Sequence, residues 1–285
     1  MGIKEIEHHS CHGGTLKVYE HESKVLGCSM KFSLFLPPQV QQGNVPLLTY
    51  LSGLTCTHDN VTAKGGAYGF AAQYGMAFLA PDTSPRGDDV PDDDAYDFGK
   101  GAGFYINATQ EPWSRHFQME DYIAKELNAL VCANFPVDTD KQGITGHSMG
   151  GHGALSLGLK YPELYKSISA FAPIVAPSEV PWGHKAFRGY LGDDRKEWLK
   201  HDSCALVEAA SDRSDFAEIL IDQGGADDFL EEQLRPALFV KACQKSGQRL
   251  SLRMQDGYDH SYYFIQSFIE DHIRHHSDIL RRAPE

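Results

Sequence analysis

The pentapeptide Gly146-His147-Ser148-Met149-Gly150 constrains this chain more than any other stretch of its sequence. Residues 142–145 before it predict a short strand that leaves a loop at 136–141, and residues 154–159 after it predict a helix. A G-x-S-x-G pattern between a strand and a helix is typical of a nucleophile elbow, where only glycine fits on either side of the turn. Ser148 would then lie at a helix N-terminus, where backbone N–H groups can stabilise an oxyanion.

Apolar patterns along the rest of the chain predict a layered α/β fold. Nearly continuous apolar runs predict strands buried on both faces of a parallel sheet, and these are 47–51, 76–80, 167–171 and 218–221. Earlier segments at 15–19 and 30–36 alternate apolar and polar residues, which predicts an antiparallel opening to the sheet. Apolar stripes at 122–131 and 264–273 predict helices. Strands alternating with helices indicate a mostly parallel central sheet flanked by helices on both faces.

Length and charge limit the domain count and the partners. The 285 residues contain no linker-like stretch and no fixed-period repeat, so we expect one domain over 1–285. The net charge of −13 argues against nucleic acid and anionic membrane as partners, and no apolar run reaches the length of a membrane span.

The cysteines and the first thirty residues point to a reducing compartment. The six cysteines are far apart and form no C-x-x-C pair, which disfavours both a zinc site and a disulfide framework. The first thirty residues lack the apolar core of a signal peptide. We therefore expect a cytoplasmic protein.

The general base of a serine hydrolase should lie on a loop near the C-terminus, and His260 meets this condition. It lies in the loop 256–261, between a predicted strand at 250–254 and the last predicted helix. His147 and His152 are too close to the elbow to reach back onto Ser148. The remaining C-terminal histidines fall in the helical pattern, where we expect solvated residues: His272, His275 and His276.

Three aspartates compete for the role of triad acid. Asp222 continues the strand at 218–221, so the pleat would fix its direction. Asp227 and Asp228 follow the Gly224-Gly225 turn, in a loop that is free to aim a carboxylate at the imidazole. Position alone does not separate Asp227 from Asp228.

The loop 52–56 follows the strand 47–51 and is a candidate for half of an oxyanion hole. In enzymes with a nucleophile elbow, one N–H comes from such a loop and the other from the residue after the nucleophile. This nominates the amides of Leu54 and Met149. An ordinary strand-end turn at Gly53 is the alternative.

Several long segments, in one order along nearly the whole chain, resemble the S-formylglutathione hydrolases, the esterase D family of α/β hydrolases. They are residues 51–56, 80–87, 101–105, 146–151, 181–183 and 257–263. The resemblance implies the α/β-hydrolase fold, with Ser148 as nucleophile, His260 as base and Asp227 as acid. It also implies hydrolysis of S-formylglutathione to formate and glutathione through a formyl-serine, in formaldehyde detoxification and with no metal or organic cofactor. Members are often homodimers. General carboxylesterase activity on short-chain acyl esters is the alternative.

Further residues are placed near the substrate by this resemblance. Cys56 resembles a family cysteine beside the active site, and Trp182 either lines the glutathione cleft or anchors a loop. Val61 and Tyr50 stand where the family usually has Phe and Trp, and we expect them to alter the shape of the acyl pocket. The acidic stretch 88–94 is expected to be solvated surface.

Overall fold

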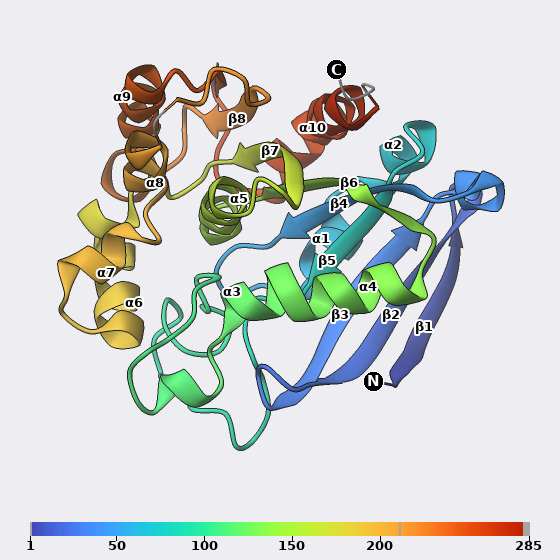
Figure 1. The fold of residues 1–285 in the computed structure, drawn as a ribbon, viewed down its shortest axis with the longest axis horizontal. Coiled ribbons are helices and arrows are strands. Elements are labelled where there is room, and N and C mark those ends of the chain that lie inside the picture. Colours follow the sequence, from blue (N-terminus) through green and yellow to red (C-terminus); the bar gives the residue numbers. More distant parts are fainter. Residues whose placement is uncertain (1, 211, 282–285) are drawn as a thin grey trace.

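The structure is a computed structural model that describes residues 2–210 and 212–281. Within these residues nine strands form one sheet, in the order β1-β2-β3-β5-β4-β6-β7-β8-β9 (Figure 1). The strands are β1 (Ile3–Cys11), β2 (Gly14–Ser23), β3 (Cys28–Leu36), β4 (Val45–Leu51), β5 (Ala77–Pro81), β6 (Val137–Gly146), β7 (Tyr165–Phe171), β8 (Ile219–Gly224) and β9 (Leu250–Gln255).

The sheet opens antiparallel and becomes parallel, as predicted. Strands β1, β2, β3 and β5 pair antiparallel, and every pair from β5 through β4, β6, β7 and β8 to β9 is parallel. Strand β1 was not predicted, because its residues are mostly exposed and polar and carry no apolar alternation. The predicted loop at 136–141 was wrong, since β6 already begins at Val137 with a polar, largely exposed first half.

Helices cover both faces of this sheet. They are α1 (His58–Lys64), α2 (Tyr68–Gln73), α3 (Met119–Asp121), α4 (Asn128–Asn134), α5 (Met149–Lys160), α6 (Pro181–Leu191), α7 (Arg195–Leu199), α8 (Ser203–Ala209), α9 (Pro236–Ser246) and α10 (Tyr262–Leu280). A π-helical segment, Tyr122–Leu127, joins α3 to α4 (Figure 1), so the helix predicted at 122–131 is present with a wider first turn.

Strand β7 shows which helices lie on which face. Gly158 of α5 packs against the side chain of Ile168, whereas His276 of α10 hydrogen-bonds to Ser167 and Ser169. Successive side chains of a strand point to opposite faces, so α5 and α10 cover opposite sides of the sheet. The predicted arrangement of helices on both faces is confirmed.

The C-terminal histidines are buried, and their expected solvent exposure was wrong. His272 and His276 are fully buried, and His275 is half-buried. Ile269, His272, Ile273 and His276 follow the i, i+3, i+4, i+7 spacing of one helix face, so the histidines share the apolar stripe that packs on the sheet. The acidic residues of 88–94 are exposed, as expected.

Among the described residues, none of the helices combines the length and the apolar character needed to cross a membrane.

Candidate active site

Ser148 lies in a strained turn between β6 and α5. Its backbone has φ +60° and ψ −119°, a conformation that L-residues rarely adopt. The glycines around it leave no room for side chains, because a Cβ on Gly150 would lie 1.9 Å from the Leu51 carbonyl oxygen. A Cβ on Gly146 would lie 2.3 Å from the Gly150 oxygen. The strand, turn and helix predicted from the pentapeptide are all present.

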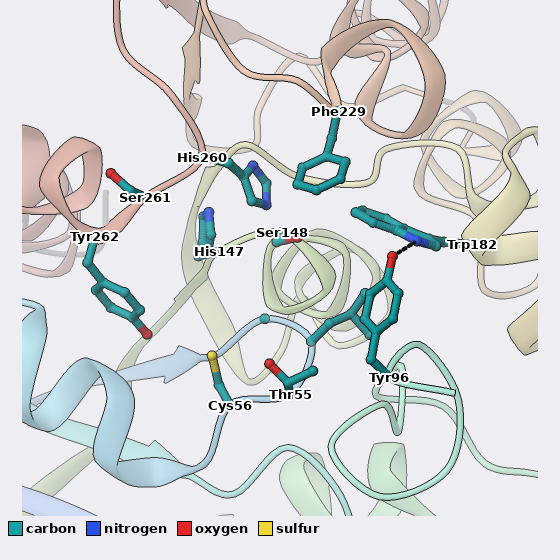
Figure 2. Close-up of a pocket in the computed structure, with 12 residues that line it drawn as sticks. Thr55, Cys56, Tyr96, His147, Ser148, Trp182, Phe229, His260, Ser261 and Tyr262 are labelled. Carbon is teal, nitrogen blue, oxygen red and sulfur yellow. Dashed lines mark hydrogen bonds between the residues drawn. The ribbon is translucent and has the colours of Figure 1, made fainter. Parts of the chain in front are cut away.

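One of the three candidate aspartates contacts His260. The Nδ1 atom of His260 lies 2.6 Å from Oδ2 of Asp227, whose side chain is fully buried. Asp227 Oδ2 also accepts a hydrogen bond from Gln223 Nε2 (3.2 Å), and its Oδ1 accepts one from the Phe229 amide (2.9 Å). Asp228 is exposed. Since Nδ1 is bonded to Asp227, Nε2 of His260 is left for the pocket that Ser148 also lines (Figure 2).

His147 and His152, in and just after the elbow, are both neutral, but they contact different groups. The His147 ring packs against the ring of His260, with 4.4 Å between their centroids. Burial, and then the neighbouring His260, hold the pKa of His147 well below its ordinary value. His152 does not line the pocket; its Nε2 hydrogen-bonds to the Phe104 carbonyl (3.0 Å), and burial lowers its pKa to about 3.

The loop after β4 is fixed against the elbow. The Thr55 amide donates to the Gly101 carbonyl (2.9 Å), and the Cys56 carbonyl accepts hydrogen bonds from Arg86 (3.1 Å) and Thr83. A Cβ built on Gly53 would lie 3.2 Å from Cβ of Ser148. Leu54 belongs to this loop and Met149 is the first residue of α5, so both candidate oxyanion amides lie in segments that contact Ser148.

Ser148 and His260 open into a pocket of about 260 Å³ with two kinds of wall. One side is aromatic. Trp182 donates a hydrogen bond through Nε1 to the Tyr96 hydroxyl (3.2 Å), and its ring packs against that of Phe229, with 4.7 Å between the centroids. The other side carries the thiol of Cys56 and the ring of Tyr262 (Figure 2). Among the described residues that line the pocket, there is neither lysine nor arginine.

Comparisons with known proteins agree with this geometry. A family model described as "Putative esterase" matches residues 23–275. The S-formylglutathione hydrolases of Paracoccus denitrificans and Mus musculus are each 50% identical, and each alignment covers 98% of this chain and 99% of the relative. The chain belongs to the esterase family that includes the S-formylglutathione hydrolases. It is therefore a hydrolase.

The fold assignment rests on a solved relative. The structure of an S-formylglutathione hydrolase from Agrobacterium tumefaciens matches with a TM-score of 0.94 and 49% identity. That match covers 97% of this chain and 99% of the other. The predicted α/β-hydrolase fold is thereby confirmed.

The pocket is lined by two of the residues expected near the substrate. These are Trp182 and Cys56, whose contact with the substrate stays a prediction. Val61 and Tyr50 do not line it, and their expected effect on the shape of the acyl pocket stays a prediction. Val61 is the buried residue of α1, and Tyr50 is buried in β4 against Phe78.

Three aromatic lining residues were not predicted from the sequence. Phe229 and Tyr262 each lie two residues after a triad candidate, a spacing that could have indicated their place beside the site. Tyr96 carries no comparable signal, because it reaches Trp182 across 86 residues of sequence.

The elbow geometry predicts a steep stability cost at Gly150. In Gly150→Ala the new methyl group would meet the fixed Leu51 carbonyl, so we expect the free energy of unfolding to fall by about 3 kcal/mol or more. Gly158→Ala in the same helix meets the side chains of Ile168 and Ile144 rather than backbone, so we expect a smaller loss, about 1–2 kcal/mol. Urea unfolding curves of the two variants test this, and equal midpoints would contradict it.

The environment of Cys56 predicts slow, pH-dependent inactivation by iodoacetamide. Burial raises the pKa of the Cys56 thiol, so little of it is thiolate at neutral pH. We expect the inactivation rate to keep rising with pH beyond about 8.5, the ordinary thiol pKa. Cys56→Ser should keep most activity and resist the reagent. If Cys56→Ser is inactivated as fast as wild type, another thiol is responsible.

Proposed function

We propose that this chain hydrolyses S-formylglutathione to formate and glutathione, with Ser148 as nucleophile, His260 as general base and Asp227 as the acid that orients it. The observation that carries the proposal is the 2.6 Å contact between His260 and the buried Asp227, at a pocket shared with a strained elbow serine. The relatives named S-formylglutathione hydrolase at 50% identity support the choice of substrate.

The first half-reaction forms an acyl-enzyme. His260 takes the Ser148 proton through Nε2 as Oγ attacks the thioester carbonyl, and Asp227 stabilises the imidazolium through Nδ1. The amides of Leu54 and Met149 stabilise the oxyanion. Glutathione leaves as a thiol of modest pKa, so it needs less proton assistance than an alcohol would.

The second half-reaction reverses these roles with water. His260 removes a proton from a water molecule, whose oxygen attacks the formyl-serine carbonyl. The second tetrahedral intermediate uses the same oxyanion amides. Its collapse releases formate and returns the proton to Ser148.

The pocket walls favour recognition of the thioester centre over the charged ends of glutathione. Aromatic rings of Tyr96, Trp182 and Phe229 form one wall, and no cation is found among the described lining residues. Cys56 at the opposite wall is also a proposed substrate contact. A general carboxylesterase for short-chain acyl esters is the second candidate, because these pocket walls do not require that the substrate carry the glutathione peptide.

We also propose a homodimer in the cytoplasm. The family resemblance supports the dimer, which sedimentation equilibrium would test. All six cysteines, each of which lies among the described residues, are free thiols, and this suits a reducing compartment.

Ser148→Ala is expected to remove hydrolysis and leave the fold intact. Loss of a triad nucleophile typically costs on the order of 10⁶ in kcat. Formate release from S-formylglutathione measures the loss, and circular dichroism controls for folding. Turnover within tenfold of wild type, with contaminating enzyme excluded, would move the catalytic centre away from the elbow.

Asp227→Asn is expected to reduce kcat on the order of 10⁴-fold, because an amide no longer fixes the productive imidazole tautomer. Asp228→Asn is the matched control, since it makes the same change on the next, exposed residue. Steady-state kinetics of both variants compare the two carboxylates. A crippling Asp228→Asn with a mild Asp227→Asn would reverse the assignment.

The proposed substrate predicts acyl-chain selectivity, if the site is shaped for a one-carbon acyl group. Each methylene that does not fit costs about 1–3 kcal/mol, so kcat/KM should fall roughly 10–200-fold per step from formyl to acetyl to longer thioesters. Rates are first divided by uncatalysed hydrolysis, because a formyl carbonyl is intrinsically more reactive. Ionic strength should change KM only weakly, since the described lining offers no cation to screen. A flat corrected profile, with simple esters turned over equally well, would favour the carboxylesterase.

A further inference from the structure

A second aspartate–histidine pair lies under the candidate site, sealed in the core. Asp222 Oδ2 lies 3.0 Å from Nε2 of His272, and Nδ1 of the same ring lies 2.8 Å from Oγ of Ser169. All three residues are fully buried. The His272 ring also stacks on Phe171, with 3.7 Å between the centroids. Asp222 is the carboxylate that competed for the role of triad acid, and the structure gives it a different histidine.

The chain of contacts continues from Ser169 to the strand that carries the nucleophile. Ser169 Oγ lies 2.8 Å from Oγ1 of Thr145, which immediately precedes the elbow. It also lies 2.8 Å from Nε2 of His276, whose Nδ1 is 2.6 Å from Ser167 Oγ. One hydroxyl on β7 therefore joins β6 to two histidines of α10.

At the other end, Asp222 fixes the end of β8. Its carboxylate accepts hydrogen bonds from Arg253 (2.8 Å to Nε, with Nη2 on the second oxygen) and from Gln255 (2.8 Å), both on β9. The next residue, Gln223, donates to Asp227. Gly224 is packed so tightly that a Cβ would lie 2.4 Å from the Tyr258 carbonyl, in the loop that carries His260. The end of β8 thus supports both the acid and the base.

The protonation states of His272, His276 and Asp222 are consistent with a fixed hydrogen-bond network. Burial lowers the pKa of His272, and it holds the pKa of His276 well below its ordinary value, so both rings are neutral. Burial opposes ionisation of Asp222, but hydrogen bonds from His272 and Arg253 lower its pKa to about 2. With both rings neutral, one set of donors accounts for the ring contacts: Ser167 donates to His276, His276 to Ser169, Ser169 to His272, and His272 to Asp222.

A buried polar network of this kind contributes little to the free energy of unfolding. Buried polar and charged groups lose hydration, and apolar residues of similar volume often stabilise a core as well or better. A hydrogen-bonded buried network instead favours one arrangement of the elements that it joins. Here those elements are the strand of the nucleophile, the strand before the acid and the helix after the base.

We propose that Thr145, Ser169, His272 and Asp222 form a positioning unit that sets the placement of the Asp227–His260 pair relative to Ser148. The proposal rests on the triad proposed above. These residues are positioning residues, because they touch the site only through the segments that they fix.

His272→Phe tests the proposal, since phenylalanine retains the stack on Phe171 and removes both hydrogen bonds. Misplacement of reacting groups by about 1 Å can cost on the order of 10²-fold in rate. We expect kcat to fall about 10–100-fold with KM within about threefold of wild type. Ser169→Ala is a milder second variant in case His272→Phe folds poorly, and it should reduce kcat in the same direction.

A double-mutant cycle separates positioning from general destabilisation. In an Asp227→Asn background the imidazole is already misaligned, so adding His272→Phe should reduce kcat by less than about threefold. The melting temperature should fall in both backgrounds. His201→Gln is the matched control, because His201 is a mostly buried histidine 3.4 Å from Glu120 near the far end of α5. It should lower the melting temperature and leave kcat unchanged.

Two outcomes would overturn the inference. In one, both His272→Phe and Ser169→Ala keep kcat within about threefold of wild type well below their melting temperatures. In the other, His272→Phe costs the same factor in both backgrounds. If Ser148→Ala is inactive while either result is found, only the positioning role fails. If Ser148→Ala stays active, the proposed triad itself fails.

Discussion

The start of α5 packs directly against the carbonyl of Leu51 at the end of β4, and the geometry of the site depends on this contact. A Cβ on Gly150 would come within 1.9 Å of that oxygen, so helix and strand meet backbone to backbone. This approach accompanies the positive φ of Ser148, because the chain must turn from β6 into α5 within two residues. It also brings the loop after β4 against Ser148. The proposed nucleophile and one of the proposed oxyanion amides are therefore placed by the same contact.

Parallel strands explain why so few residues suffice to build the site. Strands β4, β6 and β8 all end at one edge of the sheet, and the loops that follow them carry Leu54, Ser148 and Asp227. His260 comes from the loop after β9, the neighbour of β8. Each loop contributes one or two groups, while the strands fix their spacing. The buried hydrogen bonds of His272 with Ser169 and Asp222 join β7 and β8 to α10.

Local sequence patterns predicted much of this arrangement and failed where contacts are long-range. The elbow, the parallel strands and the position of His260 follow from glycine spacing, apolar runs and loop placement, which are local properties. The choice among Asp222, Asp227 and Asp228 depends on which carboxylate meets which imidazole, and the sequence contains no such information. The C-terminal histidines were misjudged because histidine is usually solvated, whereas here Ser167, Ser169 and Asp222 supply partners from other elements. The family resemblance selected Asp227 where spacing did not.

Strand β1 was not predicted from the sequence pattern, because it is an edge strand with little apolar content. Its outer backbone groups are the kind that a second molecule could extend into a larger sheet. Lys4, Glu5 and Glu7 put charge along this edge, and the register with β2 is interrupted by an irregularity between Glu5 and Glu7. A charged, irregular edge is a poor template for another strand. The same polar residues that prevented the prediction of β1 thus protect the sheet from edge-to-edge aggregation.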